Sequence, residues 1–258
     1  MCIRDSPGHD GYGADTYGES FADVYDDWYG DVTDAEATVA CLLQLAGDGP
    51  VLELGIGTGR IALPLAATGI PVVGVDASPT MLERFGAKPG AETVSTHLLD
   101  MARIGRDAEL AREGPFSVVF AAFNTFFNLP DDRAQQACLA GAATLLADGG
   151  ILAVEGFVPP SEGLTDGGVS VREVTTDAAV LTVSRHDPEH QLIRGHHIEI
   201  RTDGNRLRPW QIHYRTPAQL DASAATAGFV LVHRWADWDR TRFADHDTHV
   251  SVYRKESS

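Results

Sequence analysis

Between residues 50 and 157 the chain alternates short apolar segments with amphipathic segments, and this alternation constrains the fold more than any other feature. The apolar segments predict strands over residues 50–55, 71–76, 93–99, 116–123 and 151–157. The amphipathic segments predict helices over residues 59–69, 78–88 and 131–150. Because consecutive parallel strands need a crossover connection, strict alternation predicts a parallel sheet with helices on both faces.

Segments on either side of this region extend the pattern. Two helices are predicted before it, and a helix followed by two strands is predicted near the C-terminal end. Their ranges are 17–30, 33–47, 216–228, 229–235 and 249–254. Thr33 or Asp34 can cap the second helix. The sequence therefore predicts the α/β class, with a doubly wound, mostly parallel sheet of seven strands and an N-terminal helical cap.

The alternation stops after the fifth strand, where the pattern becomes that of antiparallel strands. Polar and apolar residues alternate with period two in four segments of residues 169–215. Turn-forming residues separate these segments at Asp177, Pro188 and Asp203. The pattern predicts an antiparallel β insertion of the meander type.

The predicted organisation has three parts: a disordered tail, a core that includes the helical cap, and the β insertion. They cover residues 1–16, residues 17–157 together with 216–254, and residues 158–215, respectively. The tail lacks hydrophobic periodicity. Its opening, MCIRDS, resembles translated adapter sequence, so we expect these six residues to be non-native.

The charge balance and the cysteines limit which classes of partner and which cellular compartment we expect. The chain carries 37 acidic and 20 basic residues, and its formal net charge is −17. A field of that sign repels polyanions and anionic lipid, so we expect neither a nucleic-acid partner nor a membrane. Cys2, Cys41 and Cys138 form no disulfide or zinc pattern, and the N-terminus has no signal-peptide character. We therefore expect a cytoplasmic setting.

A glycine-rich turn follows the first predicted strand. Gly55, Gly57 and Gly59 have the spacing G-x-G-x-G, and Glu53 precedes them. Glycine lets the chain turn tightly and lets a ligand approach the backbone, while the next helix points its N-terminus at that ligand. The dinucleotide fingerprint has a different spacing, G-x-G-x-x-G, so an NAD-linked oxidoreductase is the less favoured alternative.

Carboxylates also follow the next two strands. Asp76 ends the second strand, where it can accept hydrogen bonds from two ribose hydroxyls, and Asp100 follows the third, where it can bind an adenine amino group. Together with the E-x-G-x-G-x-G turn, this constellation resembles the class I S-adenosylmethionine-dependent methyltransferases. The resemblance covers roughly residues 17–254. It implies a Rossmann-like fold, S-adenosylmethionine as cofactor and S-adenosylhomocysteine as product.

The resemblance also implies which residues bind the cofactor. Glu53 and the glycines would hold the methionine part, Asp76 the ribose and Asp100 the adenine amino group. The full implied set is Tyr25, Glu53, Gly55, Gly57, Gly59, Arg60, Asp76, Ala77, Met81, Asp100, Met101, Ala122 and Phe123. Two alternatives stay open: Glu53 can be a structural anion bound by backbone N–H groups, and Asp100 can be a helix N-cap.

Local motifs are similar to the bacterial small-molecule branch of this family. They are FADVYDDWYG in the cap, NTFFNLPDD after the fourth strand and VEGFVP after the fifth. The insertion is similar to that of the aminosugar N,N-dimethyltransferases, which can carry a His at the position of Asn128. We predict that Asn124, Asn128 and Glu155 position the methyl acceptor, because they lie at the ends of the fourth and fifth strands.

The cap and the insertion carry further candidates for the acceptor site. They are Tyr17, Tyr29, Arg185, His186, His196, His197, Arg208, Trp210, His213 and Tyr214. Because residues two apart on a strand share a face, Arg208 and Trp210 should point the same way as Ile212. For the same reason, only one of His196 and His197 can face a cavity.

The resemblance implies methyl transfer by in-line displacement to a nitrogen or oxygen of a small molecule. A neutral amine needs no strong base, whereas a hydroxyl needs a base or a metal. The pairs His186/His190 and His246/His249 lack a third ligand at a recognisable spacing, so no metal is expected. A non-catalytic S-adenosylmethionine-binding module stays an alternative. We expect a monomer or a homodimer.

Overall fold

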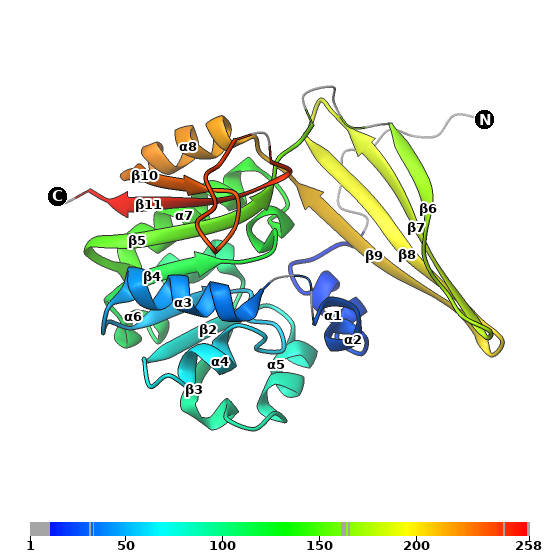
Figure 1. The fold of residues 1–258 in the computed structure, drawn as a ribbon, viewed down its shortest axis with the longest axis horizontal. Helices are drawn as coiled ribbons and strands as arrows, with labels where there is room; N and C mark the ends of the chain where they lie inside the picture. Colours follow the sequence, from blue (N-terminus) through cyan, green and yellow to red (C-terminus); the bar gives the residue numbers. More distant parts are fainter. Residues whose placement is uncertain are drawn as a thin grey trace.

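A seven-stranded sheet forms the centre of the molecule (Figure 1). The computed structural model describes residues 11–30, 32, 34–160, 164, 166–244 and 246–256. The strands of this sheet are β1 (Val51–Leu54), β2 (Val72–Asp76), β3 (Val94–Leu98), β4 (Phe116–Ala121), β5 (Leu146–Phe157), β10 (Phe229–Trp235) and β11 (Thr248–Lys255). Their order is β10-β11-β5-β4-β1-β2-β3, and β11 runs antiparallel to both of its neighbours. The predicted α/β class and mostly parallel sheet are confirmed.

Helices cover both faces of this sheet, as the alternation predicts. They are α3 (Ala35–Ala46), α4 (Ala62–Ala66), α5 (Pro79–Gly86), α6 (Leu110–Glu113), α7 (Asp132–Leu145) and α8 (Pro217–Thr226), with 3₁₀ turns η1 (Ala91–Thr93), η2 (Met101–Arg106) and η3 (Thr125–Asn128). One buried cluster joins α3, α4 and α5 to one face, and a second joins α7 and α8 to the other. Cys41 and Cys138 are both buried in these clusters.

Several helix ends follow from local side chains that the sequence already displays. The side chain of Asp34 accepts a hydrogen bond from the N–H of Ala37 and caps α3, and Ser78 caps α5 in the same way. Thr216 and Gln219 form a capping box at α8. Thr33, the other predicted cap for α3, lies outside the described residues.

Three predicted helices are shorter or broken in the structure. The helix predicted over 17–30 is two short helices, α1 (Thr16–Phe21) and α2 (Tyr25–Tyr29). The helix predicted over 59–69 is reduced to α4, which contains Pro64. The helix predicted over 131–150 ends at Leu145, because Leu146 already pairs with Phe116 as part of β5.

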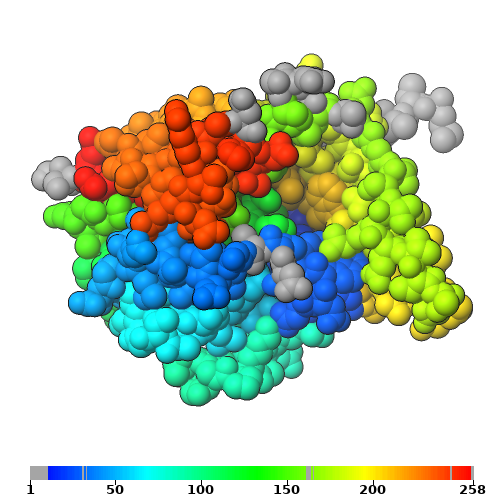
Figure 2. Space-filling view, in the orientation of Figure 1, coloured from blue at the N-terminus to red at the C-terminus, as the bar shows by residue number. Residues whose placement is uncertain are grey.

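The segment predicted as an insertion contains a second, four-stranded antiparallel sheet, here called sheet B. Its strands are β6 (Gly167–Val174), β7 (Ala178–Asp187), β8 (Leu192–Arg201) and β9 (Gly204–His213), in the order β6-β7-β8-β9. Sheet B stands beside the core, and the cap helices α1 and α2 lie between the two (Figures 1 and 2). The proposed division into a core and an insertion at residues 158–215 stays a prediction, and residues 1–10 of the predicted tail lie outside the described residues.

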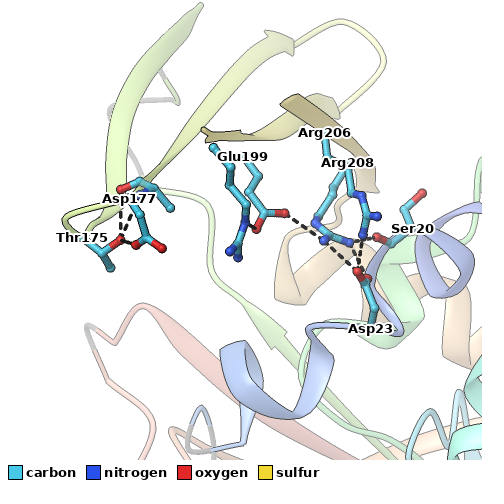
Figure 3. Close-up of polar contacts among 9 residues, drawn as sticks. Ser20, Asp23, Thr175, Asp177, Glu199, Arg206 and Arg208 are labelled. Carbon is cyan, nitrogen blue, oxygen red and sulfur yellow. Dashed lines mark hydrogen bonds and ion pairs between the residues drawn. The ribbon is translucent and has the colours of Figure 1, made fainter. Parts of the chain in front are cut away.

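An ion network fastens the cap to sheet B (Figure 3). Arg208 on β9 is only 2% exposed, and it donates to both carboxylate oxygens of Asp23, at 2.5 and 3.0 Å, and to the carbonyl oxygen of Ser20 at 2.5 Å. It also donates to Glu199 on β8 at 3.0 Å. Asp23 lies in the break between α1 and α2, and it also pairs with Arg206. The network therefore joins two segments that are far apart in the sequence.

Removing Arg208 should destabilise the protein because the buried carboxylate of Glu199 would lose a cationic partner. We expect Arg208→Met to lower the free energy of unfolding by about 3 kcal/mol, measured by urea denaturation. The double variant Arg208→Met/Glu199→Leu should lose clearly less, since it buries no unpaired carboxylate. Arg254→Met, at an exposed position on β11, is the control and should change the stability by under about 0.5 kcal/mol. Equal losses in the single and double variants would contradict this account.

Candidate cofactor and acceptor site

A cavity of about 280 Å³ lies where the carboxyl ends of the central strands meet the cap and sheet B. This is the place where open α/β sheets bind ligands. Eleven predicted site residues line it: Tyr25, Gly55, Gly57, Asp76, Ala77, Met81, Asp100, Met101, Phe123, Asn124 and Asn128. Five predicted residues are not among its described lining: Glu53, Gly59, Arg60, Ala122 and Glu155. The structure thus brings together residues from the cap and from the loops after β1, β2, β3 and β4.

The three glycines of the turn have positive φ angles but serve different needs. A Cβ at Gly55 would meet the Thr125 side chain at 2.4 Å, and a Cβ at Gly59 would meet the Phe85 ring at 2.6 Å. At Gly57 the nearest atom to an added Cβ is on the ring of Tyr25, 3.9 Å away across the cavity. Gly55 and Gly59 are therefore required by packing, whereas Gly57 leaves space for a ligand against the backbone.

Asp76 ties the glycine turn to the end of β2. Its carboxylate accepts hydrogen bonds from the N–H groups of Gly57 at 2.8 Å and of Ser78 at 2.9 Å. Burial raises the pKa of Asp76, and these backbone hydrogen bonds oppose the rise. A carboxylate oxygen has more than one lone pair, so Asp76 keeps capacity to accept from ligand hydroxyls in the cavity.

Asp100 both caps a 3₁₀ turn and lines the cavity. Its side chain accepts a hydrogen bond from the N–H of Ala102 at 2.9 Å and caps η2, as the N-cap alternative requires. The same residue lines the cavity. Its contact with an adenine amino group stays a prediction.

Glu53 is buried behind the glycine turn with an unusual environment for a carboxyl group. Its side chain is only 5% exposed, and within the described part of the chain its Oε2 atom has no hydrogen-bond partner. Burial raises the pKa of Glu53 to about 8, while the Arg60 guanidinium opposes the rise. A cationic ligand group near the turn would stabilise the ionised carboxylate.

The loop after β4 is held in a strained conformation by groups behind the cavity wall. Phe123 and Asn124 have φ angles of 46° and 62°. Glu155 accepts hydrogen bonds from the N–H of Phe123 at 2.7 Å and from the indole of Trp238 at 2.9 Å, and Asn124 accepts from the N–H of Phe157 at 2.7 Å. The structure therefore places Glu155 behind the wall, where it supports the loop, and places Asn124 and Asn128 in the wall.

The end of the cavity nearest the cap is aromatic. The rings of Tyr17, Tyr25 and Tyr29 contact one another, with centroids 5.2 Å apart for Tyr25 and Tyr29 and 6.5 Å apart for Tyr17 and Tyr25. Phe123 approaches Tyr29 at 5.9 Å. Burial raises the pKa of Tyr17 well above its ordinary value and that of Tyr25 to about 12, so these phenols are neutral near pH 7.

Sheet B contributes His197, Trp210 and Ile212 to the same end of the cavity. His197 is buried and His196 is exposed, which confirms that only one of the pair faces inward. The imidazole of His197 lies 3.4 Å from the Tyr29 hydroxyl at Nε2 and 2.9 Å from the Thr182 hydroxyl at Nδ1. The indole nitrogen of Trp210 is buried and has no partner among the side chains and backbone groups described. It is therefore a buried donor whose hydrogen-bonding capacity is unused.

The other histidine candidates belong to separate contacts. His186 pairs with the hydroxyl of Tyr214 at 2.8 Å, His190 with Asp187 at 2.9 Å and His249 with Ser251 at 2.8 Å. Over the described ranges, no three His, Cys, Asp or Glu side chains come together as a set of metal ligands.

None of the helices in those ranges has the length and apolar character needed to cross a bilayer.

Sequence reasoning missed part of the lining. The missed residues are Ala14, Gly18, Val75, Leu99, Thr125, Leu129 and Pro130. Most are small or apolar and carry no chemical signal, because their contribution is shape. Leu99 and Thr125 could have been found from their positions directly beside Asp100 and Asn124 at the ends of strands.

Comparisons with known proteins agree with this geometry. A family model described as "Methyltransferase domain" matches residues 51–150. The solved structure of the CcbJ methyltransferase from Streptomyces caelestis is 40% identical, with a TM-score of 0.85, and the match covers 95% of this chain and 100% of that chain.

Two curated relatives match over shorter stretches. The cypemycin N-terminal methyltransferase of a Streptomyces species is 33% identical over 133 residues, which is 48% of each chain. Glycine N-methyltransferase from Homo sapiens is 26% identical over 166 residues, which is 56% of each chain. The matched region thus spans about half the length of these two relatives.

The space beside Gly57 gives a direct test of cofactor binding. Gly57→Ala should weaken S-adenosylmethionine binding more than about tenfold in titration calorimetry, because the methyl group would occupy the cradle of the ligand. The positive φ should itself cost about 1–2 kcal/mol of stability. Gly69→Ala is the matched control: its φ is +94° and nothing lies within 4 Å of an added Cβ. It should bear a similar strain and bind normally, and equal affinities in both variants would refute the placement.

The raised pKa of Glu53 predicts a proton release on cofactor binding. At about pH 7 the free protein carries mostly protonated Glu53, since its pKa is about 8. The ammonium of S-adenosylmethionine would favour the ionised form, so binding should release a proton and tighten as the pH rises from about 6 to about 8. Calorimetry in buffers of different ionisation enthalpy measures this release, and Glu53→Gln should reduce it. A buffer-independent enthalpy would contradict the prediction.

Proposed function

We propose that this chain, which belongs to the class I S-adenosylmethionine-dependent methyltransferases, transfers a methyl group to the nitrogen of a small-molecule amine. We choose nitrogen over oxygen as the methyl acceptor because one end of the cavity is aromatic and uncharged. This end lies directly beside the strand-end acids. The cypemycin and glycine methyltransferases among its relatives, both named for a nitrogen or N-terminal acceptor, support the same choice.

The strand-end residues suit the cofactor. Gly57 would leave room for its methionine part, Glu53 would face the ammonium, Asp76 would hold the ribose and Asp100 the adenine amino group. The space beside Gly57 and the unpartnered oxygen of Glu53 fit this group. When bound, S-adenosylmethionine supplies an electrophilic methyl group on a positively charged sulfur.

The acceptor end suits an amine better than a hydroxyl. Within the described lining, the carboxylates are those of Asp76 and Asp100, which the proposal assigns to the cofactor. The neutral phenols of Tyr17 and Tyr25 can attract a cation through their rings but cannot act as strong bases near pH 7. A free amine is nucleophilic without a base, whereas a hydroxyl is not.

The roof of the cavity supports transfer away from water. The cap and sheet B cover the strand ends together, and the Arg208 network fastens one to the other. Alignment and desolvation provide most of the rate enhancement in a displacement with a good leaving group. The ring of Trp210 would pack against the acceptor and so orient its nitrogen.

Family membership removes the NAD-linked alternative, and the remaining alternative is a module that binds the cofactor without catalysis. An acceptor end lined by His197, Trp210 and three tyrosines supports an enzyme. The small-molecule acceptor, the cytoplasmic setting and a monomer or homodimer remain parts of the proposal. The net charge of −17 supports the absence of a nucleic-acid partner.

Matched pairs of amine and hydroxyl acceptors test the proposal. We expect S-adenosylhomocysteine to form more than about tenfold faster with glycine or sarcosine than with glycolate, and faster with glucosamine than with glucose. Mass spectrometry of S-adenosylhomocysteine and of the methylated product measures both rates. Gly57→Ala is the control for background hydrolysis of the cofactor. Equal transfer to the hydroxyl acceptors would contradict an amine specificity, and no transfer to any amine would favour the non-catalytic module.

A further inference from the structure

A row of hydrogen-bonding groups leads from the aromatic end of the cavity into sheet B. Tyr29 lines the cavity. The Tyr29 hydroxyl lies 3.4 Å from Nε2 of His197, and Nδ1 of His197 lies 2.9 Å from the hydroxyl of Thr182. Thr182 is only half-buried, so solvent reaches this residue at the end of the row. The row therefore spans from the buried cavity to the surface.

The β-sheet register holds these groups in place. Thr182 on β7 pairs with His197 on β8, and His197 pairs with Arg208 on β9, so the three side chains lie side by side on one face. Arg208 is itself fastened to the cap through Asp23. The same ion network that closes the cavity thus keeps His197 against Tyr29.

Burial, together with two neighbouring cations, keeps the ring of His197 neutral. Arg172 on β6 and Arg208 on β9 are both cationic, and Tyr29 of the cap is a neutral phenol. Burial, assisted by these two guanidinium groups, lowers the pKa of His197 to about 4. A neutral imidazole has one nitrogen that donates and one that accepts, so it can pass a proton across its ring. Because the imidazolium is disfavoured, a proton does not become trapped there.

We propose that His197 and Thr182 carry to solvent the proton that an acceptor ammonium loses when it is methylated. The inference rests on the proposed N-methylation, in which a protonated amine must lose one proton before its lone pair can attack. Residues of the cap and sheet B line the acceptor end of the cavity, and the row gives this proton a path through that wall.

The acceptor loses one proton for each methyl group that it receives, and each proton transfer along the row forms one bond and breaks another. The N–H bond of the acceptor breaks as a bond to the Tyr29 oxygen forms. The proton of Tyr29 moves to Nε2 of His197, the Nδ1 proton moves to Thr182, and the hydroxyl proton of Thr182 passes to water. Tyr29 and Thr182 end as they began, and His197 ends with its proton on Nε2. Exchange with water after product release restores the Nδ1–H form.

Substitutions along the row should produce a defect that depends on pH. With sarcosine as the acceptor, His197→Asn and Thr182→Val should lower kcat more than about tenfold near pH 7. The loss of kcat should become smaller as the pH rises toward about 9, because a larger fraction of the sarcosine then binds as the neutral amine. Thr182→Ser keeps the hydroxyl and should stay close to the wild type. His196→Asn, one residue away on the opposite face of β8, is the matched control and should show no defect.

Two measurements separate this role from a structural one. The affinity for S-adenosylmethionine should stay within about twofold of the wild type in every variant. Nitrogen-15 spectra of the histidine rings should show His197 neutral near pH 7, with its proton on Nδ1, and His197→Asn assigns the signal. An imidazolium at that pH, or a proton on Nε2, would overturn the relay whether or not sarcosine is methylated.

The outcomes also separate this inference from the proposed function. Normal turnover by the wild type with a defect that is the same at every pH overturns the relay and leaves N-methylation standing. No turnover by the wild type with sarcosine or any other amine overturns the proposed function and the relay together. A pH-dependent defect in both His197→Asn and Thr182→Val, with normal activity in Thr182→Ser, supports the relay.

Discussion

The ion network centred on Arg208 is the interaction on which the closed site depends. A guanidinium that is 2% exposed loses its hydration, and this loss is offset only because Ser20, Asp23 and Glu199 all accept hydrogen bonds from it. Since these partners come from the cap and from β8, the compensation exists only when the cap and sheet B are together. The contacts that stabilise the network therefore also hold the cap and sheet B together over the cavity.

The lining of the cavity has acidic groups at one end and uncharged groups at the other. The acids, Asp76 and Asp100, lie at the ends of β2 and β3, whereas the cap and sheet B provide phenols, an indole and a neutral imidazole. A cationic cofactor next to an aromatic, uncharged wall favours an acceptor that reacts as a neutral nucleophile. The division follows from the fold, because strand ends supply one half of the site and peripheral segments the other.

Features that depend on local sequence were predictable, and features that depend on distant contacts were not. The alternation, the glycine turn, Asp76 and the caps at Asp34, Ser78 and Thr216 each depend on neighbouring residues. The break at Asp23 was missed because Arg208, its partner, lies far along the chain. The carboxylate of Glu155 was predicted in the wall, but its contact with Trp238 holds it behind the wall, and no local pattern indicates that pairing. Strand periodicity limited the inward histidine to His196 or His197, and only the register decided between them.

Trp210 joins sheet B to the acceptor end of the cavity. Arg208, Trp210 and Ile212 share one face of β9, as period two requires, so the residue that anchors the strand lies directly beside two that shape the cavity. The indole of Trp210 lies over Gly195, where an added Cβ would approach its ring to 2.4 Å. The position of this wall residue therefore depends on a glycine on the neighbouring strand, and Trp210 also packs against a cluster that includes Met81 of α5. A change at Gly195 or Trp210 would therefore reshape the space for the acceptor.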